Sequence, residues 1–121
     1  MWETVVVVFT REEVEGMKRF YGIKYDEDER LKAHLVDRAE EILTCDWRDR
    51  WDWVKKAEGK IPADGVMPVS QFMRIKYSDY PDLEPISYIL TPESMGFGWK
   101  RVKKDLAPYK DGWVVIMDCH Y

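Results

Sequence analysis

The sequence predicts an α+β fold: a small, mostly antiparallel four-stranded sheet with helices on one face. Three observations lead to this prediction. Short apolar runs rich in valine and isoleucine occur near the start, in the second half and at the end of the chain, as strands require. Longer stretches have apolar residues at a helical period. The connections in the second half are rich in proline, glycine and aspartate, which is typical of turns.

The first strand is expected at Val5–Phe9, a β-branched run that ends in an aromatic residue. It is apolar on both faces, which suits an interior position in a sheet. A helix is expected directly after it, because Thr10 and Glu13 have the spacing of a capping box. Gly22 is expected to end this helix.

A second helix is expected from Asp26, with Asp26 as its cap and Glu29 bonding back. Its buried stripe would be Leu31, Leu35, Ala39 and Ile42. A single helix up to residue 57 would be about 45 Å long at about 1.5 Å per residue, which is too long for a domain of this size. The sequence therefore predicts a kink or break near Thr44–Asp46.

A third helix is expected at Trp47–Glu58, because Asp46 is a good cap and Gly59 a good stop. On this helix Trp47, Trp51 and Val54 share one buried face. Trp53 points away from that face and has arginines and aspartates around it. Since tryptophan and arginine dominate binding hot spots, Trp53 and Arg50 are interpreted as anchors for a partner. The alternative is that Trp53 covers another element of the same domain.

The second half of the chain is predicted to hold three strands and one helix. Val69–Tyr77 alternates loosely, as a half-buried strand does, and most simply forms an antiparallel pair with Ile86–Leu90. Thr91-Pro92 starts a helix whose apolar stripe is Met95, Trp99, Val102 and Leu106. Trp113–Met117 is a last strand, apolar on both faces.

This order of elements, less one extra helix, is βαββαβ, the ferredoxin-like arrangement. The last strand of that fold is an edge, yet Trp113–Met117 has the composition of an interior strand. Another sheet order, or a homodimer that continues the sheet, would resolve the conflict.

Length and composition indicate one domain over residues 1–121, with the proportions of hydrophobic and charged residues that are typical of a soluble protein. The chain is 45% hydrophobic and 35% charged. Its net charge of −4 excludes a generally basic nucleic-acid binder. Two cysteines are too few for a disulfide scaffold. No secretory signal and no run of about 20 apolar residues is present. A cytoplasmic protein with reduced thiols and no membrane partner is expected.

The expected partner surface combines the two anchors with acidic residues. Acid and tyrosine on the turn-rich connection at residues 77–84 suit a basic partner surface, although an ordinary polar loop has the same composition. Beside Trp53 and Arg50, the predicted partner-binding residues are Asp49, Glu40, Glu41, Asp79, Tyr80, Asp82 and Glu84.

A basic segment offers a nucleic-acid-binding alternative. Gly96-Phe97-Gly98-Trp99 resembles part of the Gly-Phe-Gly-aromatic core of the RRM family, whose strand stacks bases. It departs from that core at Met95, Lys100 and Val102. The residues that would bind nucleic acid are Lys100, Arg101, Lys103 and Lys104, which equally suit the solvated C-terminal end of a helix.

No catalytic or metal-binding motif is found. The soft ligands are His34, Cys45, Cys119 and His120, and their spacing does not fit a zinc site. No metal or cofactor is therefore expected. A small enzyme whose site is assembled from distant residues, such as Asp46, Asp49, His34 or His120, is kept as a further hypothesis.

The leading hypothesis is a non-enzymatic interaction protein that docks acidic and aromatic surfaces on a protein or nucleoprotein partner. The chain is small and acidic, with six tryptophans and seven tyrosines. In type and composition it is similar to phage-encoded inhibitors of host or defence machinery, which include anti-CRISPR proteins and DNA mimics. This is a likeness of class, carried by no motif.

Overall fold

The computed structural model describes residues 2–46, 50–57, 61–76, 79, 86–92, 95–97 and 106–121. The elements are β1 (Trp2–Phe9), α1 (Arg11–Tyr21), α2 (Glu29–Glu41), β2 (Trp53–Lys56), β3 (Val66–Pro68), α3 (Val69–Phe72), β4 (Ile86–Leu90), β5 (Met95–Phe97) and β6 (Trp113–His120). A π-helical turn, Ile42–Asp46, follows α2, and 3₁₀ turns lie at Pro62–Gly65 and Ala107–Tyr109. No helix in these ranges is long and apolar enough to cross a membrane.

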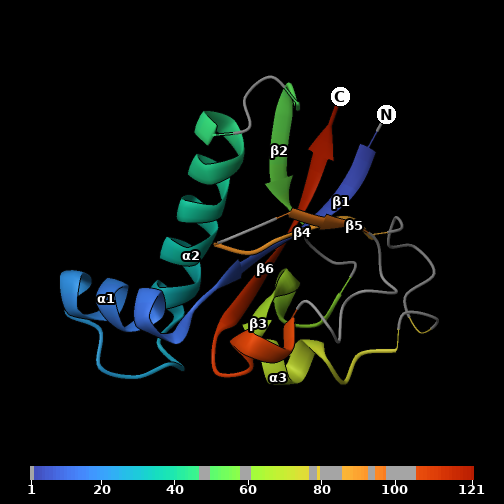
Figure 1. The fold of residues 1–121 in the computed structure, drawn as a ribbon. Helices are drawn as coiled ribbons and strands as arrows, with labels where there is room; N and C mark the ends of the chain where they lie inside the picture. Colours follow the sequence, from blue (N-terminus) through green and yellow to red (C-terminus); the bar gives the residue numbers. More distant parts are fainter. Residues whose placement is uncertain are drawn as a thin grey trace.

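The strands form one mixed sheet in the order β2-β6-β1-β4-β5, and β3 also pairs with β6 (Figure 1). β1 and β4 run parallel, while the four other described pairings are antiparallel. β2 pairs with β6 residues 117–120 and β3 with residues 113–115, so β2 and β3 lie end to end along one edge of β6. The α+β class and the mostly antiparallel sheet are confirmed, but the predicted count of four strands is wrong.

The ferredoxin-like arrangement is not shown. Its second strand would precede β4 in the chain and pair with it, whereas the observed partner, β5, follows β4. The expected interior position of Trp113–Met117 is confirmed, because β6 lies between β1 and the β2–β3 edge. Extra strands within the chain therefore resolve the conflict that the sequence posed.

β1 and β6 divide the core into two layers because their side chains alternate between the two sheet faces. One layer contains Val5, Val7, Val115 and Met117 and is covered by α1 and α2. The other contains Val6, Val8, Val114 and Ile116 and is covered by α3 and the Ala107–Tyr109 turn (Figure 1). Helices therefore lie on both faces, and the expectation of one covered face is wrong.

The first two helices form as the sequence predicts, with one correction. Thr10 caps α1 through a complete capping box with Glu13, and Gly22 closes the helix in the left-handed conformation. The cap of α2 is Asp28, which accepts a hydrogen bond from the backbone N–H of Arg30. Asp26 was expected to be this cap; it binds the side chains of α1 instead.

The predicted break after α2 is confirmed, but the predicted helix at Trp47–Glu58 is wrong. The π-helical turn ends α2, and residues 53–56 form β2. Trp53 and Lys55 are exposed and Val54 is buried, which is the alternation of a strand. Trp51 and Val54 are buried in one core layer, as predicted. Trp47 lies outside the described residues.

Two further predictions in the second half are corrected. Val69–Phe72 is a helical turn, with Val69 and Phe72 buried, and not the start of a strand. Pro68 is both the last residue of β3 and the N-cap of this helical turn. Ile86–Leu90 is a strand as predicted, but it pairs with β1 and β5. Residues 95–97 form β5 rather than part of a helix that begins at Thr91.

Candidate interaction surface

Three aromatic side chains lie in a row across the ends of β1, β6 and β2. The register places His120 opposite both Trp2 and Trp53. The ring centroids of Trp2 and Trp53 are 5.5 Å apart, and those of Trp2 and His120 are 5.0 Å apart in an edge-to-face arrangement. Trp53 is 59% exposed. The ends of these strands lie beside both chain termini (Figure 1).

Lys55 completes this surface. Its Nζ lies 4.9 Å from the centroid of the Trp2 ring and 5.8 Å from that of Trp53. A cation at such distances is attracted by the negative face of the ring. Asp52 flanks the row, with Oδ1 at 3.4 Å from Nδ1 of His120. We name Trp2, Trp53, His120 and Lys55 the aromatic platform.

The other predicted anchor, Arg50, stacks elsewhere. Its guanidinium carbon lies 4.1 Å from the centroid of the Tyr88 ring and 5.6 Å from that of Trp51. Trp51 is buried and donates a hydrogen bond from Nε1 to Oε1 of Glu3. Since Trp51 and Tyr88 pack in the layer beneath α1 and α2, Arg50 covers that layer. The structure therefore does not bring Arg50 and Trp53 together.

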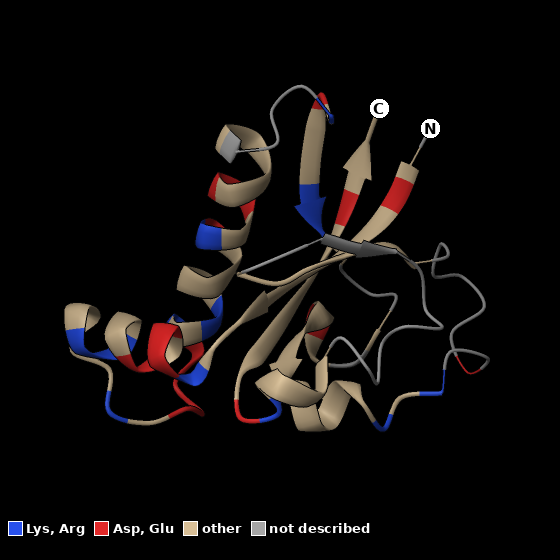
Figure 2. Ribbon diagram, in the orientation of Figure 1, with Lys and Arg blue, Asp and Glu red and all other residues tan. Residues whose placement is uncertain are grey.

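The predicted acidic residues are only partly described. Glu40 is half-buried on α2, and Glu41 forms an ion pair of 2.9 Å with Arg38. Asp79 is exposed. The other predicted partner-binding residues, Asp49, Tyr80, Asp82 and Glu84, lie outside the described residues, as does the basic set Lys100, Arg101, Lys103 and Lys104. Acidic and basic residues are interspersed along α1 and α2, and β2 ends in two lysines (Figure 2).

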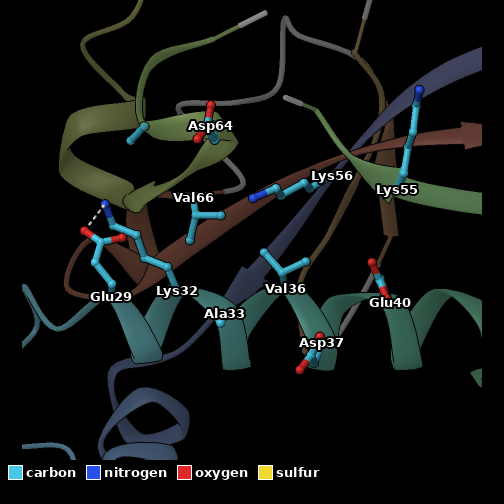
Figure 3. Close-up of a pocket in the computed structure, with 11 residues that line it drawn as sticks. Glu29, Lys32, Ala33, Val36, Asp37, Glu40, Lys55, Lys56, Asp64 and Val66 are labelled. Atoms are coloured by element: carbon cyan, nitrogen blue, oxygen red, sulfur yellow. Dashed lines mark ion pairs between the residues drawn. The ribbon is translucent and has the colours of Figure 1, made fainter. Parts of the chain in front are cut away.

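A hollow of about 760 Å³ lies between α2 and the strand edge formed by β2 and β3. We name it the edge groove. Figure 3 shows Val36 and Val66 facing each other across it, with Lys56 extending between them. The groove is lined by Glu29, Lys32, Ala33, Val36, Asp37, Glu40, Lys55, Lys56, Ala63, Asp64 and Val66.

The soft ligands do not meet. His34 stacks on Tyr21 with ring centroids 3.5 Å apart, while His120 belongs to the platform. Cys45 is exposed and Cys119 is buried. Burial, with the charges of Glu3 and Asp118, raises the pKa of the Cys119 thiol far above its usual range. In the part of the chain that the structure describes, no three His, Cys, Asp or Glu side chains are grouped to hold a metal ion.

Sequence reasoning selected Trp53 but missed Trp2, Lys55 and the groove. The sequence holds no local signal for Lys55, because Trp53-Val54-Lys55 does not alternate between apolar and polar residues and its exposed-buried-exposed pattern appears only when β2 pairs with β6. The role of Trp2 depends on pairing with β6, more than one hundred residues away. We found no match to this chain among protein-family models, curated proteins or solved structures.

Proposed function

We propose that this protein is a protein-binding domain that docks a partner through the aromatic platform. The observation that carries the proposal is the exposure of Trp53, at 59%, in a side chain that is nonetheless held by ring contacts. An exposed tryptophan exposes a large apolar area to water, and its burial by a partner is favourable.

The contacts of Trp53 support a role as a preformed anchor. Trp2 packs against its ring, and Lys55 lies over both rings. Because the side chain is already ordered, binding costs less conformational entropy than for a free side chain. Tryptophan is also enriched among the few residues that supply most of the energy of an interface. The charged rim of Lys55 and Asp52 would give such an interface its orientation.

The partner class follows from composition. The net charge of −4 favours a protein or nucleoprotein partner over free nucleic acid. An inhibitor of the phage type, acting on host or defence machinery, is the member of this class that the composition favours. The acidic residues and the platform would then dock on one large partner.

The test is affinity capture from a host lysate, with and without nuclease, followed by measurement of affinity for the captured protein. Trp53→Ala is expected to weaken binding at least tenfold, the loss typical of a hot-spot residue. Tyr25→Ala is the matched control, because Tyr25 is a 69% exposed aromatic residue outside the platform. This control is expected to bind like the wild type.

Two outcomes would contradict the proposal. Equal affinity of the wild type and Trp53→Ala would remove the platform from the interface. Capture that disappears with nuclease would favour the basic segment at residues 100–104 as a nucleic-acid-binding site, with an affinity that falls steeply with salt.

A further inference from the structure

The outer face of α1 combines an exposed aromatic ring with two opposite charges. At about 100° per residue, the four residues Glu12, Gly16, Arg19 and Phe20 fall within an arc of about 100° on this helix. Val14 lies on the opposite side of the helix and is buried in the core. Phe20 is 82% exposed, and Glu12 and Arg19 are exposed as well. This face therefore presents apolar and charged groups to solvent.

Gly16 lies within this arc and leaves a notch in the face. Apart from the backbone of α1 and the adjacent residues, the only described atom that an added Cβ would meet within 4 Å is Nη2 of Arg19, at 3.8 Å. Glycine is a poor helix former, so its presence inside α1 costs stability. The packing of the described residues gives no steric reason for a glycine at this position. A glycine does, however, let another backbone approach closely.

Glu12 and Arg19 are the two charged residues of the arc, and they stand near its two ends. Neither forms an ion pair with a residue that the structure describes. The other charged side chains of α1 are bound within the same copy: Arg11 and Lys18 to Asp26, Glu15 to Arg11, and Glu13 to the backbone N–H of Thr10. The face therefore offers one anion and one cation to a partner.

We propose that α1 binds α1 of a second copy of this chain, antiparallel, about a twofold axis that passes beside Gly16. The two glycines then face each other where the backbones are closest. Helical side chains lean toward the N-terminus of their own helix, so each Phe20 ring lies over the notch at Gly16 of the other copy. A twofold axis sets each flank of the helix against the same flank of the other copy. Arg19 therefore meets Glu12 of the other copy, and the symmetry repeats this pair.

A second copy fits this face because the face is its own complement. A partner surface of one charge sign would set a like charge against either Glu12 or Arg19, which is unfavourable. Two further cations do not change this balance. Arg38 of α2, which lines the hollow beside Phe20, is paired with Glu41 at 2.9 Å. Lys24 follows the helix and would extend past the acidic first turn of the other copy, where its charge is attractive.

This dimer goes beyond the proposed function, because it assigns a second surface that the aromatic platform does not require. α1 follows the end of β1 that is farthest from Trp2, and it lies away from both chain termini (Figure 1). The dimer therefore leaves both platforms exposed. Two linked platforms would bind a partner with repeated sites more tightly than one platform does.

Sedimentation equilibrium of the protein alone, over about 5–500 µM, tests the proposal. α1 has 11 residues and is about 16 Å long at about 1.5 Å per residue. Because such an interface is smaller than the standard size, a dissociation constant of about 10–100 µM is expected. Gly16→Gln fills the notch and is expected to weaken the dimer at least tenfold. The same change should raise the midpoint of thermal unfolding at low protein concentration, because glutamine is a better helix former than glycine.

Trp53→Ala is the matched control, because it removes an exposed aromatic side chain outside α1 and is expected to dimerise like the wild type. Exchange of charges tests the antiparallel pairing. Glu12→Arg and Arg19→Glu are each expected to be monomeric alone, since like charges then face each other across the axis. Their equimolar mixture is expected to form a heterodimer, because both pairs become complementary.

Three results would overturn the proposal. They are a monomeric wild type over the whole concentration range, equal association of the wild type and Gly16→Gln, and a mixture of the two charge variants that stays monomeric. Loss of the dimer in Trp53→Ala would also overturn it, because the contact would then lie at the platform. Since no partner protein is needed here, failure of the dimer is distinct from failure of the platform.

Discussion

Asp26, in the loop between α1 and α2, binds two cationic side chains of α1. Its carboxylate accepts hydrogen bonds from the guanidinium of Arg11 at 2.9 Å and from Nζ of Lys18 at 2.8 Å. The Lys18 side chain is only 9% exposed. The hydrogen bond from Arg11, with the one from Lys18, lowers the pKa of Asp26 below its usual range against the opposing effect of burial. The loop between the helices is therefore held by charge.

Asp26→Asn is expected to lower the free energy of unfolding by about 1–2 kcal/mol at pH 7, because the nearly buried Lys18 loses its nearer anion and keeps only Glu15, at 3.4 Å. Because folding lowers the pKa of Asp26, its carboxylate stabilises the fold at pH values above the pKa of about 3.9 that it has in the unfolded chain. This contribution to the free energy of unfolding disappears as the pH falls through the lower pKa of the folded state. The difference between wild type and variant should therefore narrow below about pH 4. Urea unfolding at pH 7, 5 and 3 measures it.

Glu27→Gln is the control for this prediction, because Glu27 is the exposed neighbour of Asp26 and its replacement removes the same charge. This control is expected to change the free energy of unfolding by less than about 0.5 kcal/mol. A pH-independent difference for Asp26→Asn would show that the ion pairs are not its source.

At the scale of elements, local signals predicted β1, α1, α2 and β4 because each carries its own pattern. Thr10 with Glu13 and the valine run of β1 need no distant partner to be recognised. β2 and β5 depend on neighbours instead, since four- and three-residue strands are stabilised by pairing with β6 and β4. The helix expected at Trp47–Glu58 was based on a cap, Asp46, and a stop, Gly59, and these local signals favoured the wrong element.

The candidate surface was predictable only at its centre. Trp53 was recognised as an outward-facing tryptophan, although the reason given, a helix, was wrong. Trp2 and Lys55 join it through strand pairing that sequence periodicity does not encode. The edge groove likewise depends on the packing of α2 beside β2 and β3, which is a tertiary property.

Hydrogen exchange distinguishes the strand from the predicted helix at β2. The amides of Lys55 and Ala57 face β6 and are expected to be protected, while the amide of Val54 faces away from β6 and should exchange much faster. An NMR exchange series at neutral pH and 25 °C measures this alternation. Equal protection of Val54, Lys55 and Ala57 would contradict this pairing of β2 with β6.

At the scale of the whole molecule, a sheet covered on both faces protects the centre of the fold. β6 is buried along all but its last residue and pairs with β1, β2 and β3. Helices from the first third of the chain cover one layer, and segments from the second half cover the other. Opening β6 therefore separates both layers at once, and we expect the sheet to unfold cooperatively.

Cys119 on β6 reports on this cooperativity. It has no exposed surface, and burial raises the pKa of its thiol, so the reactive thiolate is suppressed in the folded protein. In a Cys45→Ser variant, which removes the exposed thiol, Cys119 is expected to react with a thiol reagent only at the rate of global unfolding.

The raised pKa also fixes a pH dependence. The contribution of Cys119 to the free energy of unfolding is complete below about pH 8.5, the pKa of a thiol in the unfolded chain. It declines as the pH rises from there toward the higher thiol pKa of the folded protein. Labelling of Cys45→Ser from pH 7 to 9, compared with unfolding rates from tryptophan fluorescence, measures both effects. Labelling much faster than unfolding would mean that β6 opens locally, and the two layers would then not unfold as one unit.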